Sequence, residues 1–288
     1  MKRQLLGVAA ILLSISTYAQ DNPLWMRYCA ISPDGTTIAF TYKGDIYTVP
    51  STGGRASQIT TNPAHDTKPI WSPDGKKIAF ASDRMGSMDI FEENKEGGIP
   101  KRLTTHSGNE TPVAYKDAGH ILFLANIMPT AEDAQFPSGQ FQQVYEVNTE
   151  GGRPILFSSM PMEDISINHT GNTLLYHDKK GYEDPWRKHH TSSITRDIWL
   201  CSLNGNRTFR KQTAFNGEDR TPVWASDDKS FYYLSEEKGS FNIFKRDIDG
   251  NTSKQITNHT KHPVRFLSAA SNGTLCYGYD GEIYTVKE

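Results

Sequence analysis

The sequence has few cysteines, no excess of either charge and no apolar run long enough to span a membrane comfortably. Its three cysteines are Cys29, Cys201 and Cys276, among 288 residues. An odd number scattered this widely does not form a disulfide framework, so we expect buried thiols that pack as small apolar side chains. Cys29 and Cys276 occupy apolar runs near opposite ends of the chain, and a circular fold would bring them close.

The charges nearly cancel, with 31 Lys and Arg against 33 Asp and Glu. This balance gives no electrostatic reason to bind nucleic acid or anionic lipid. Hydrophobic residues make up 36% of the chain, but aromatic residues make up 11%, which is too many for a disordered chain. The composition excludes a coiled coil, a collagen-like chain and a polytopic membrane protein, and it is typical of an all-β protein with many turns.

The common catalytic motifs are also absent. The sequence has no Gly-x-Ser-x-Gly, no His-Glu-x-x-His, no cysteine pair with zinc spacing and no glycine-rich phosphate loop that opens a helix. We therefore predict no catalytic residue, no metal site and no cofactor on this chain, which leaves open whether the protein is an enzyme.

The first twenty residues have the pattern of a cleavable signal peptide. Lys2 and Arg3 precede the apolar segment 5–15, small residues follow at Thr17 and Ala19, and polar residues come next. The pattern predicts an exported, periplasmic protein with no membrane span after cleavage; the alternative is an uncleaved N-terminal anchor. Loss of the two basic residues changes the net charge from −2 to −4.

The rest of the chain is a repeat. Segment 69–80 reads Pro-x-Trp-Ser-Pro-Asp-Gly-x-x-Ile-Ala-Phe, and segment 32–40 repeats its second part. The first apolar residue of the second strand recurs six times, at Ile38, Ile78, Ile121, Leu174, Phe231 and Leu275. Four short strands per interval of 40–57 residues are typical of a β-propeller blade, whereas a β-helix or a sandwich needs a shorter period or none. We predict one domain over 21–288, a six-bladed β-propeller of four-stranded antiparallel blades.

The outermost strand of a blade is recognisable only five times, so blade six lacks one. Either the segment Leu24–Arg27 supplies the missing strand, or the natural protein continues past Glu288. We favour continuation, because proteins usually cover an unpaired sheet edge.

Two intervals are longer than the others because of insertions at about 126–142 and 177–196, between the second and third strands of blades three and four. Such loops share one face of a propeller, so this face is a candidate docking or gating surface. Trp186 is expected to anchor a contact there, with Arg187 and Lys188 receiving an anionic group such as a peptide carboxylate, and His189 and His190 beside them. In the alternative interpretation Trp186 packs on the propeller and the charges are solvated.

Charged residues beside the blade turns are interpreted as structural groups that satisfy the backbone. They are Asp66, Asp83, Arg84, Asp89, Asp219 and Arg220.

The repeated unit resembles the PD40 (TolB-like) propeller repeat. The whole mature chain, including segments 184–187 and 195–199, resembles the first, six-bladed propeller of tricorn-type proteases of peptidase family S41. The resemblance implies a non-catalytic region that positions or gates peptide substrates and docks serine-protease domains further along the same protein. A homo-oligomer is a further expectation. In archaeal members an arginine pair after the second blade holds a substrate C-terminus, and segment 107–112 has no such pair.

Two other functions fit the same repeats. One is a free-standing periplasmic TolB-like scaffold that binds proteins, and the other is the propeller half of a dipeptidyl-peptidase-like hydrolase. A catalytic region further along the chain would distinguish both hydrolases from the scaffold.

Overall fold

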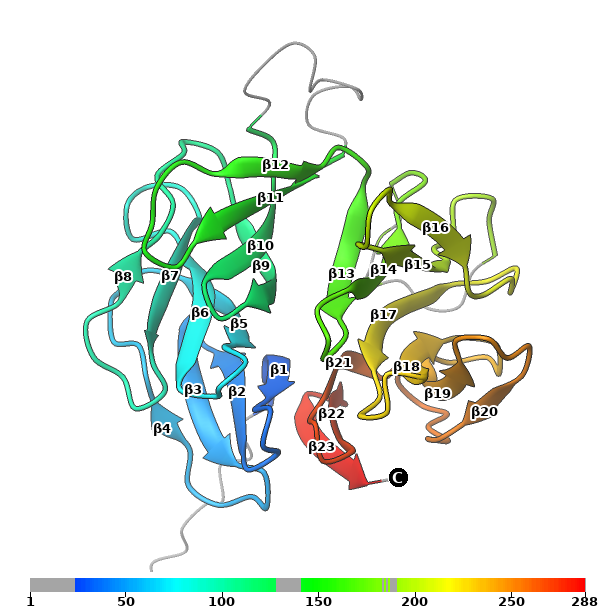
Figure 1. The fold of residues 1–288 in the computed structure, drawn as a ribbon. Helices are drawn as coiled ribbons and strands as arrows, with labels where there is room; N and C mark the ends of the chain where they lie inside the picture. Colours follow the sequence, from blue (N-terminus) through cyan, green and yellow to red (C-terminus); the bar gives the residue numbers. More distant parts are fainter. Residues whose placement is uncertain (1–23, 128–140, 183, 185, 187–190, 288) are drawn as a thin grey trace, which may run out of the picture.

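The structure, a computed structural model, describes residues 24–127, 141–182, 184, 186 and 191–287. Here the repeats form six antiparallel sheets, five of four strands and one of three, and each is an up-and-down meander. The predicted all-β, six-bladed propeller is confirmed (Figure 1). No helix in the described part of the chain is both long and apolar enough to cross a membrane. The predicted signal peptide lies outside the described residues.

The first three blades consist of β1 (Arg27–Ile31), β2 (Thr37–Tyr42), β3 (Asp45–Pro50) and β4 (Ser57–Gln58); β5 (Asp66–Trp71), β6 (Lys77–Ser82), β7 (Asp89–Asn94) and β8 (Lys101–Arg102); and β9 (Thr111–Asp117), β10 (His120–Ala125), β11 (Gln143–Asn148) and β12 (Ile155–Ser158). The last three consist of β13 (Met162–Ile167), β14 (Thr173–Asp178), β15 (Ile198–Ser202) and β16 (Thr208–Lys211); β17 (Asp219–Trp224), β18 (Ser230–Ser235), β19 (Asn242–Asp247) and β20 (Ser253–Gln255); and β21 (Arg265–Ala269), β22 (Thr274–Tyr279) and β23 (Glu282–Lys287).

The first strand of each blade lies at the centre of the ring. β1 contacts β5, each innermost strand contacts the next, and β21 returns to β1. Figure 1 shows the blades following one another around this centre, with the last blade beside the first. The six innermost strands therefore surround the axis of the propeller.

The Ser-Pro-Asp-Gly sequence makes the turn between the first two strands of a blade. In blade two the N–H of Gly75 donates to the carbonyl of Ser72 at 2.9 Å, and Ser72 Oγ donates to Asp74 Oδ1 at 2.7 Å. Gly75 has φ +67°, a left-handed conformation that glycine adopts without steric cost. In blade five Asp228 takes the same place in the turn, with φ 52°.

In four of the five blades that have an outer strand, a threonine after that strand links it to the third strand. In four blades the N–H of an isoleucine in the third strand donates to this threonine Oγ1 at 2.9–3.0 Å; the pairs are Ile46 with Thr60, Ile90 with Thr104, Ile198 with Thr213 and Ile243 with Thr257. Because β4 and β8 have only two residues each, these side-chain bonds add to the links between the outer strand and the third strand.

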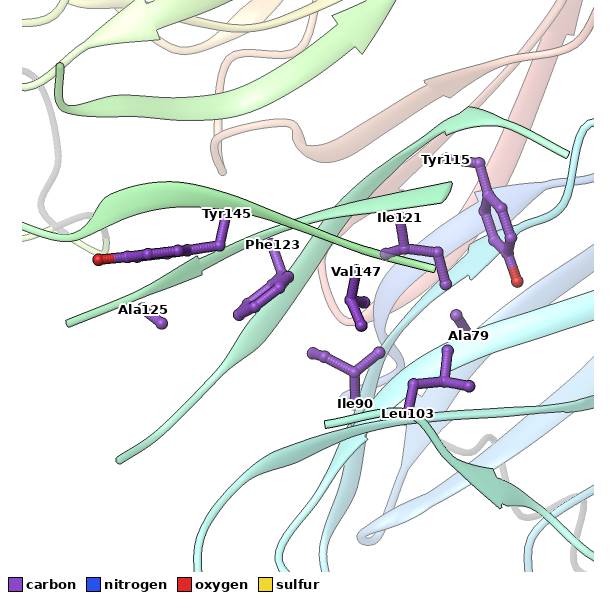
Figure 2. Close-up of a cluster of buried hydrophobic side chains, with 9 residues drawn as sticks. All are labelled: Ala79, Ile90, Leu103, Tyr115, Ile121, Phe123, Ala125, Tyr145 and Val147. Carbon is purple, nitrogen blue, oxygen red and sulfur yellow. The ribbon is translucent and has the colours of Figure 1, made fainter. Parts of the chain in front are cut away.

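The core lies between neighbouring blades. In Figure 2, Ile90 and Leu103 of blade two point toward Val147 and Phe123 of blade three. Phe123 and Ile90 are fully buried, and each such side chain stabilises the fold by about 1.5–3 kcal/mol. All three cysteines are buried, as expected, and Cys29 and Cys276 share the cluster between blades six and one.

The sixth blade has three strands in the described part of the chain. The alternative in which Leu24–Arg27 supplies its fourth strand is wrong. Residues 24–26 form no strand, and the N–H of Met26 instead donates to the carbonyl of Gly281, in the turn between β22 and β23, at 3.1 Å. Continuation of the natural protein past Glu288 stays a prediction.

Blade two buries an unpaired carboxyl group. Glu93 is 5% exposed, and within the described residues neither of its carboxyl oxygens has a hydrogen-bond partner. Burial raises its pKa from 4.5 to about 7, although the charge of Arg84 opposes this shift. The folded state therefore holds a proton that the unfolded chain loses above pH 4.5. The stability that this protonated carboxyl group contributes is therefore fully present below pH 4.5 and is lost as the pH rises through about 7.

Glu93→Gln keeps the shape of this side chain and removes its titration. We expect the variant to melt a few degrees above the parent at pH 8, and this gap to narrow at pH 5. Thermal unfolding followed by circular dichroism at both pH values measures it, with Glu96→Gln as an exposed control. An equal gap at pH 5 and pH 8 would contradict the assigned titration.

Candidate functional site: the central channel

Five of the six innermost strands contain the same β-bulge. In each, two residues oppose one aromatic residue of the second strand, and the first of the two has a left-handed backbone. These first residues are Tyr28 (φ 52°), Lys68 (φ 54°), Asp164 (φ 49°), Thr221 (φ 51°) and Phe266 (φ 57°). A non-glycine residue in this conformation costs about 1–2 kcal/mol, and such strain is concentrated at functional sites.

The bulges turn these side chains toward the axis of the propeller, where all five line one cavity. In blade three Pro112 holds the equivalent position and also lines the cavity. We call these six residues the channel ring: Tyr28, Lys68, Pro112, Asp164, Thr221 and Phe266. The cavity has a volume of about 620 Å³, within the range of ligand-binding sites.

One side of the channel ring is aromatic. The rings of Tyr28 and Phe266 lie 4.8 Å apart between blades one and six, and Lys68 Nζ lies 5.6 Å from the centre of the Tyr28 ring. Burial raises the pKa of Tyr28 and lowers the pKa of Lys68; the carboxylates of Asp164 and Glu163 oppose the shift of Lys68.

The other side carries hydrogen-bonded charges from blades four and five. Thr221 Oγ1 donates to Asp164 Oδ2 at 2.7 Å, and the N–H of Thr221 donates to His177 Nδ1 at 3.2 Å. Since Nδ1 accepts, the proton of His177 is on Nε2, which donates to Glu163 Oε2 at 3.2 Å. Lys179 Nζ lies 2.7 Å from the other oxygen of Glu163.

These contacts keep Glu163 ionised. Although burial acts in the opposite direction, the bonds from His177 and Lys179 hold the pKa of Glu163 well below its usual range. Arg196 Nε lies 3.5 Å from Glu163, and its Nη1 donates to the buried Glu218 at 2.6 Å. The network thus joins blades four and five at the channel.

Arg220 reaches the cavity from blade five. Its guanidinium lies 4.0 Å from the centre of the Phe241 ring and 3.6 Å from Glu218, and burial lowers its pKa to about 10. Across the described residues, the cavity lining holds five cations and two carboxylates. The cations are Lys68, Lys179, Arg196, Arg220 and Arg265, and the carboxylates are Glu163 and Asp164.

Trp186, from the insertion in blade four, packs at this cavity against blades six and one. Its ring lies 4.8 Å from the guanidinium of Arg265, 5.0 Å from that of Arg27 and 6.1 Å from the ring of Phe266. Arg265 Nη2 also donates to the Trp186 carbonyl at 3.2 Å, yet the residue remains 45% exposed. Trp186 therefore contacts Arg27 of blade one and Arg265 and Phe266 of blade six.

These contacts fit the alternative in which Trp186 packs on the propeller. Because the residue is still 45% exposed, its role in binding stays a prediction. The other predicted binding residues, Arg187, Lys188, His189 and His190, lie outside the described residues. In the described part of the chain no group of His, Cys, Asp and Glu is placed to hold a metal ion.

Of the charged turn residues, Asp83 satisfies the backbone, since the N–H of His65 donates to its Oδ1 at 2.8 Å. Asp66, Arg84 and Asp89 instead form ion pairs with side chains. Arg84 Nη2 bonds both oxygens of the buried Asp66, at 2.8 and 2.9 Å, and Arg102 lies 2.7 Å from Asp89. For Arg220 the structural interpretation is incomplete, because this residue also lines the channel.

Sequence reasoning missed the channel ring. Its signal is the aromatic residue that opposes each bulge, third in the apolar run of the second strand; the five are Phe40, Phe80, Tyr176, Tyr233 and Tyr277. Aligning the repeats on these residues marks the positions of the ring in the preceding strand.

A family model described as the tricorn protease N-terminal β-propeller domain matches residues 23–288. The chain belongs to this family. The resemblance noted from the repeats is therefore confirmed.

Curated relatives agree with this assignment. Tricorn protease homolog 1 of Streptomyces coelicolor is 25% identical over 268 residues, which is 92% of this chain and 24% of that protein. The tricorn protease of Thermoplasma acidophilum is 24% identical over 272 residues, 91% of this chain and 24% of that protein. The chain thus spans about a quarter of the length of these relatives.

Among solved structures, the crystal structure of the tricorn protease superimposes with a TM-score of 0.74 at 21% identity, covering 92% of this chain and 25% of that one. TolB from Acinetobacter baumannii gives a TM-score of 0.59 at 16% identity, covering 91% and 57%. At these identities the superpositions show the fold alone.

Proposed function

We propose that this chain is the non-catalytic N-terminal region of an exported, tricorn-like serine protease, and that its central channel receives and positions peptide substrates. The observation that carries the proposal is the channel ring. Five strained bulges turn side chains into one cavity of about 620 Å³, at which an exposed tryptophan packs. Strain repeated around one axis is the pattern expected of a binding site rather than of a packed core.

The chemistry of the cavity suits an extended peptide. Aromatic rings on one side offer surface for apolar side chains, and hydrogen-bonding groups on the other face the polar backbone. Trp186, half-exposed and within about 5 Å of two guanidinium groups, is placed to contact a chain that enters the channel.

Docking and export complete the proposal. The face that bears the insertions of blades three and four is the proposed docking surface for protease domains further along the same protein. The basic start, the apolar segment 5–15 and the small residues Thr17 and Ala19 support export. The matched relatives, about four times as long as this chain, support continuation beyond the propeller.

An antibody to the propeller tests both points on the natural protein. Immunoprecipitation from the periplasmic fraction should yield a protein far heavier than 32.3 kDa whose N-terminus is Gln20 or Asp21. A band near 30 kDa would contradict the protease hypothesis and favour the free-standing scaffold. If the protein is instead in the membrane fraction with Met1 at its N-terminus, the N-terminal segment is an uncleaved anchor and not a cleaved signal peptide.

Trp186→Ala tests the role of the channel in binding. We expect it to raise the Kd for an unstructured, fluorescein-labelled decapeptide about five- to tenfold, the effect of losing an aromatic anchor, with little change in Tm. Fluorescence anisotropy gives the Kd. Trp25→Ala is the matched control, because Trp25 is 70% exposed and also stacks with Arg27, but does not line the cavity. A large fall in Tm with an unchanged Kd would make Trp186 a packing residue only.

A further inference from the structure

Lys68 differs from the other cations of the channel. Each of the others has a partner, whereas Lys68 Nζ forms no hydrogen bond or ion pair within the described residues; it lies over the face of the Tyr28 ring, at 5.6 Å. A left-handed bulge, with φ 54°, turns this residue into the cavity. The strand thus carries backbone strain to present an ammonium group to the channel.

The carboxylates across the channel are already bonded. Asp164 accepts from Thr221 at 2.7 Å and lies 3.6 Å from His177, while Glu163 is held by His177, Lys179 and Arg196. Neither carboxylate comes within 4.0 Å of Lys68 Nζ, so neither forms an ion pair with it, although both attract its charge from a greater distance. Lys68 is partly buried, and an ammonium group with restricted access to water and no partner is costly; a carboxylate ligand would supply that partner.

The charge of the whole lining favours the same ligand. Its five cations exceed its two carboxylates, and Glu218, which is buried behind the lining against Arg196 and Arg220, adds only one more negative charge. An anion that enters the channel therefore meets a positive field in a chain whose overall charge is slightly negative.

Next to Lys68 the channel wall is aromatic. Tyr28 packs against Phe266, and Phe266 packs against Trp186 at 6.1 Å, so three rings follow one another along blades one and six. A ligand that fills this corner presents a negative group to the ammonium and a large apolar group to the rings.

We propose that the channel ring binds a peptide carboxylate through Lys68, with a neighbouring aromatic or large aliphatic side chain against Tyr28 and Phe266. This inference rests on the proposed function and specifies its substrate class. The carboxylate is either the C-terminus of a peptide or the side chain of an Asp or Glu residue. Lys68 lies on the innermost strand of blade two, whereas segment 107–112, which carries no arginine, leads into the innermost strand of blade three.

Three labelled peptides separate the possibilities. The first ends in Gly-Phe with a free C-terminus, the second is its C-terminal amide, and the third is an amide with an internal Asp-Phe pair. The purified protein should bind the first or the third about tenfold more tightly than the second, measured by fluorescence anisotropy. The tighter of the two identifies the source of the carboxylate.

Lys68→Met should abolish that tenfold preference, and Lys68→Arg should retain most of it. Lys43→Met is the matched control, since Lys43 also has a left-handed backbone (φ 52°) and lies 5.3 Å from a tyrosine ring, but is exposed outside the channel. Its preference should equal that of the parent. Unchanged melting temperatures show that each variant is folded.

Two results overturn the inference, and they are distinguishable. If all three peptides bind equally, or if Lys68→Met keeps the preference, Lys68 does not recognise a carboxylate. The inference then fails, but the proposed function is not contradicted. If none of the peptides binds the parent protein, both the inference and the proposed function fail.

Discussion

The packing of β1 against β21 closes the ring, and the channel exists only while that contact is made. No strand is shared between the first and last described blades, so closure rests on side chains and a few backbone bonds. The N–H of Ile31 donates to Ser268 Oγ at 3.0 Å, and the N–H of Ser271 donates to the Pro33 carbonyl at 2.9 Å. The buried cluster that includes Cys29 and Cys276 fills the space between the two blades. Because Tyr28 and Phe266 belong to these same strands, the aromatic side of the channel ring is part of the closure itself.

The innermost strands therefore both close the ring and form the proposed binding site. The face of each innermost strand that packs between blades is apolar and repeats around the ring, which makes the fold tolerant of differences elsewhere. The bulge residue varies from blade to blade: it is tyrosine, lysine, aspartate, threonine or phenylalanine. A regular scaffold thus presents an irregular set of groups to the axis, with rings and an ammonium on one side and a hydrogen-bonded charge network on the other.

Much of the fold could be predicted from the sequence because its signals are local. The Ser-Pro-Asp-Gly turn and the threonine after the outer strand act within one blade: the turn bond joins residues two positions apart, and the threonine bond joins residues 14 positions apart. The channel ring could not be predicted, because a bulge is a property of the register between two strands and Lys68 reads simply as a polar residue in a strand. Trp186 was recognisable as a candidate, but its partners Arg27 and Arg265 are about 160 and 79 residues away in the chain. Only closure of the ring brings them to it.

The central claim is that a peptide occupies the channel rather than an outer surface of the propeller. Photo-cross-linking measures this directly: a peptide with benzoylphenylalanine beside its carboxylate is bound, irradiated and mapped by mass spectrometry after digestion. The account predicts cross-links on β1 and β21, at or next to Tyr28 and Phe266, and on Trp186. Cross-links confined to the outer strands β4, β8, β12, β16 and β20 would contradict it and would make the rim of the propeller its binding surface.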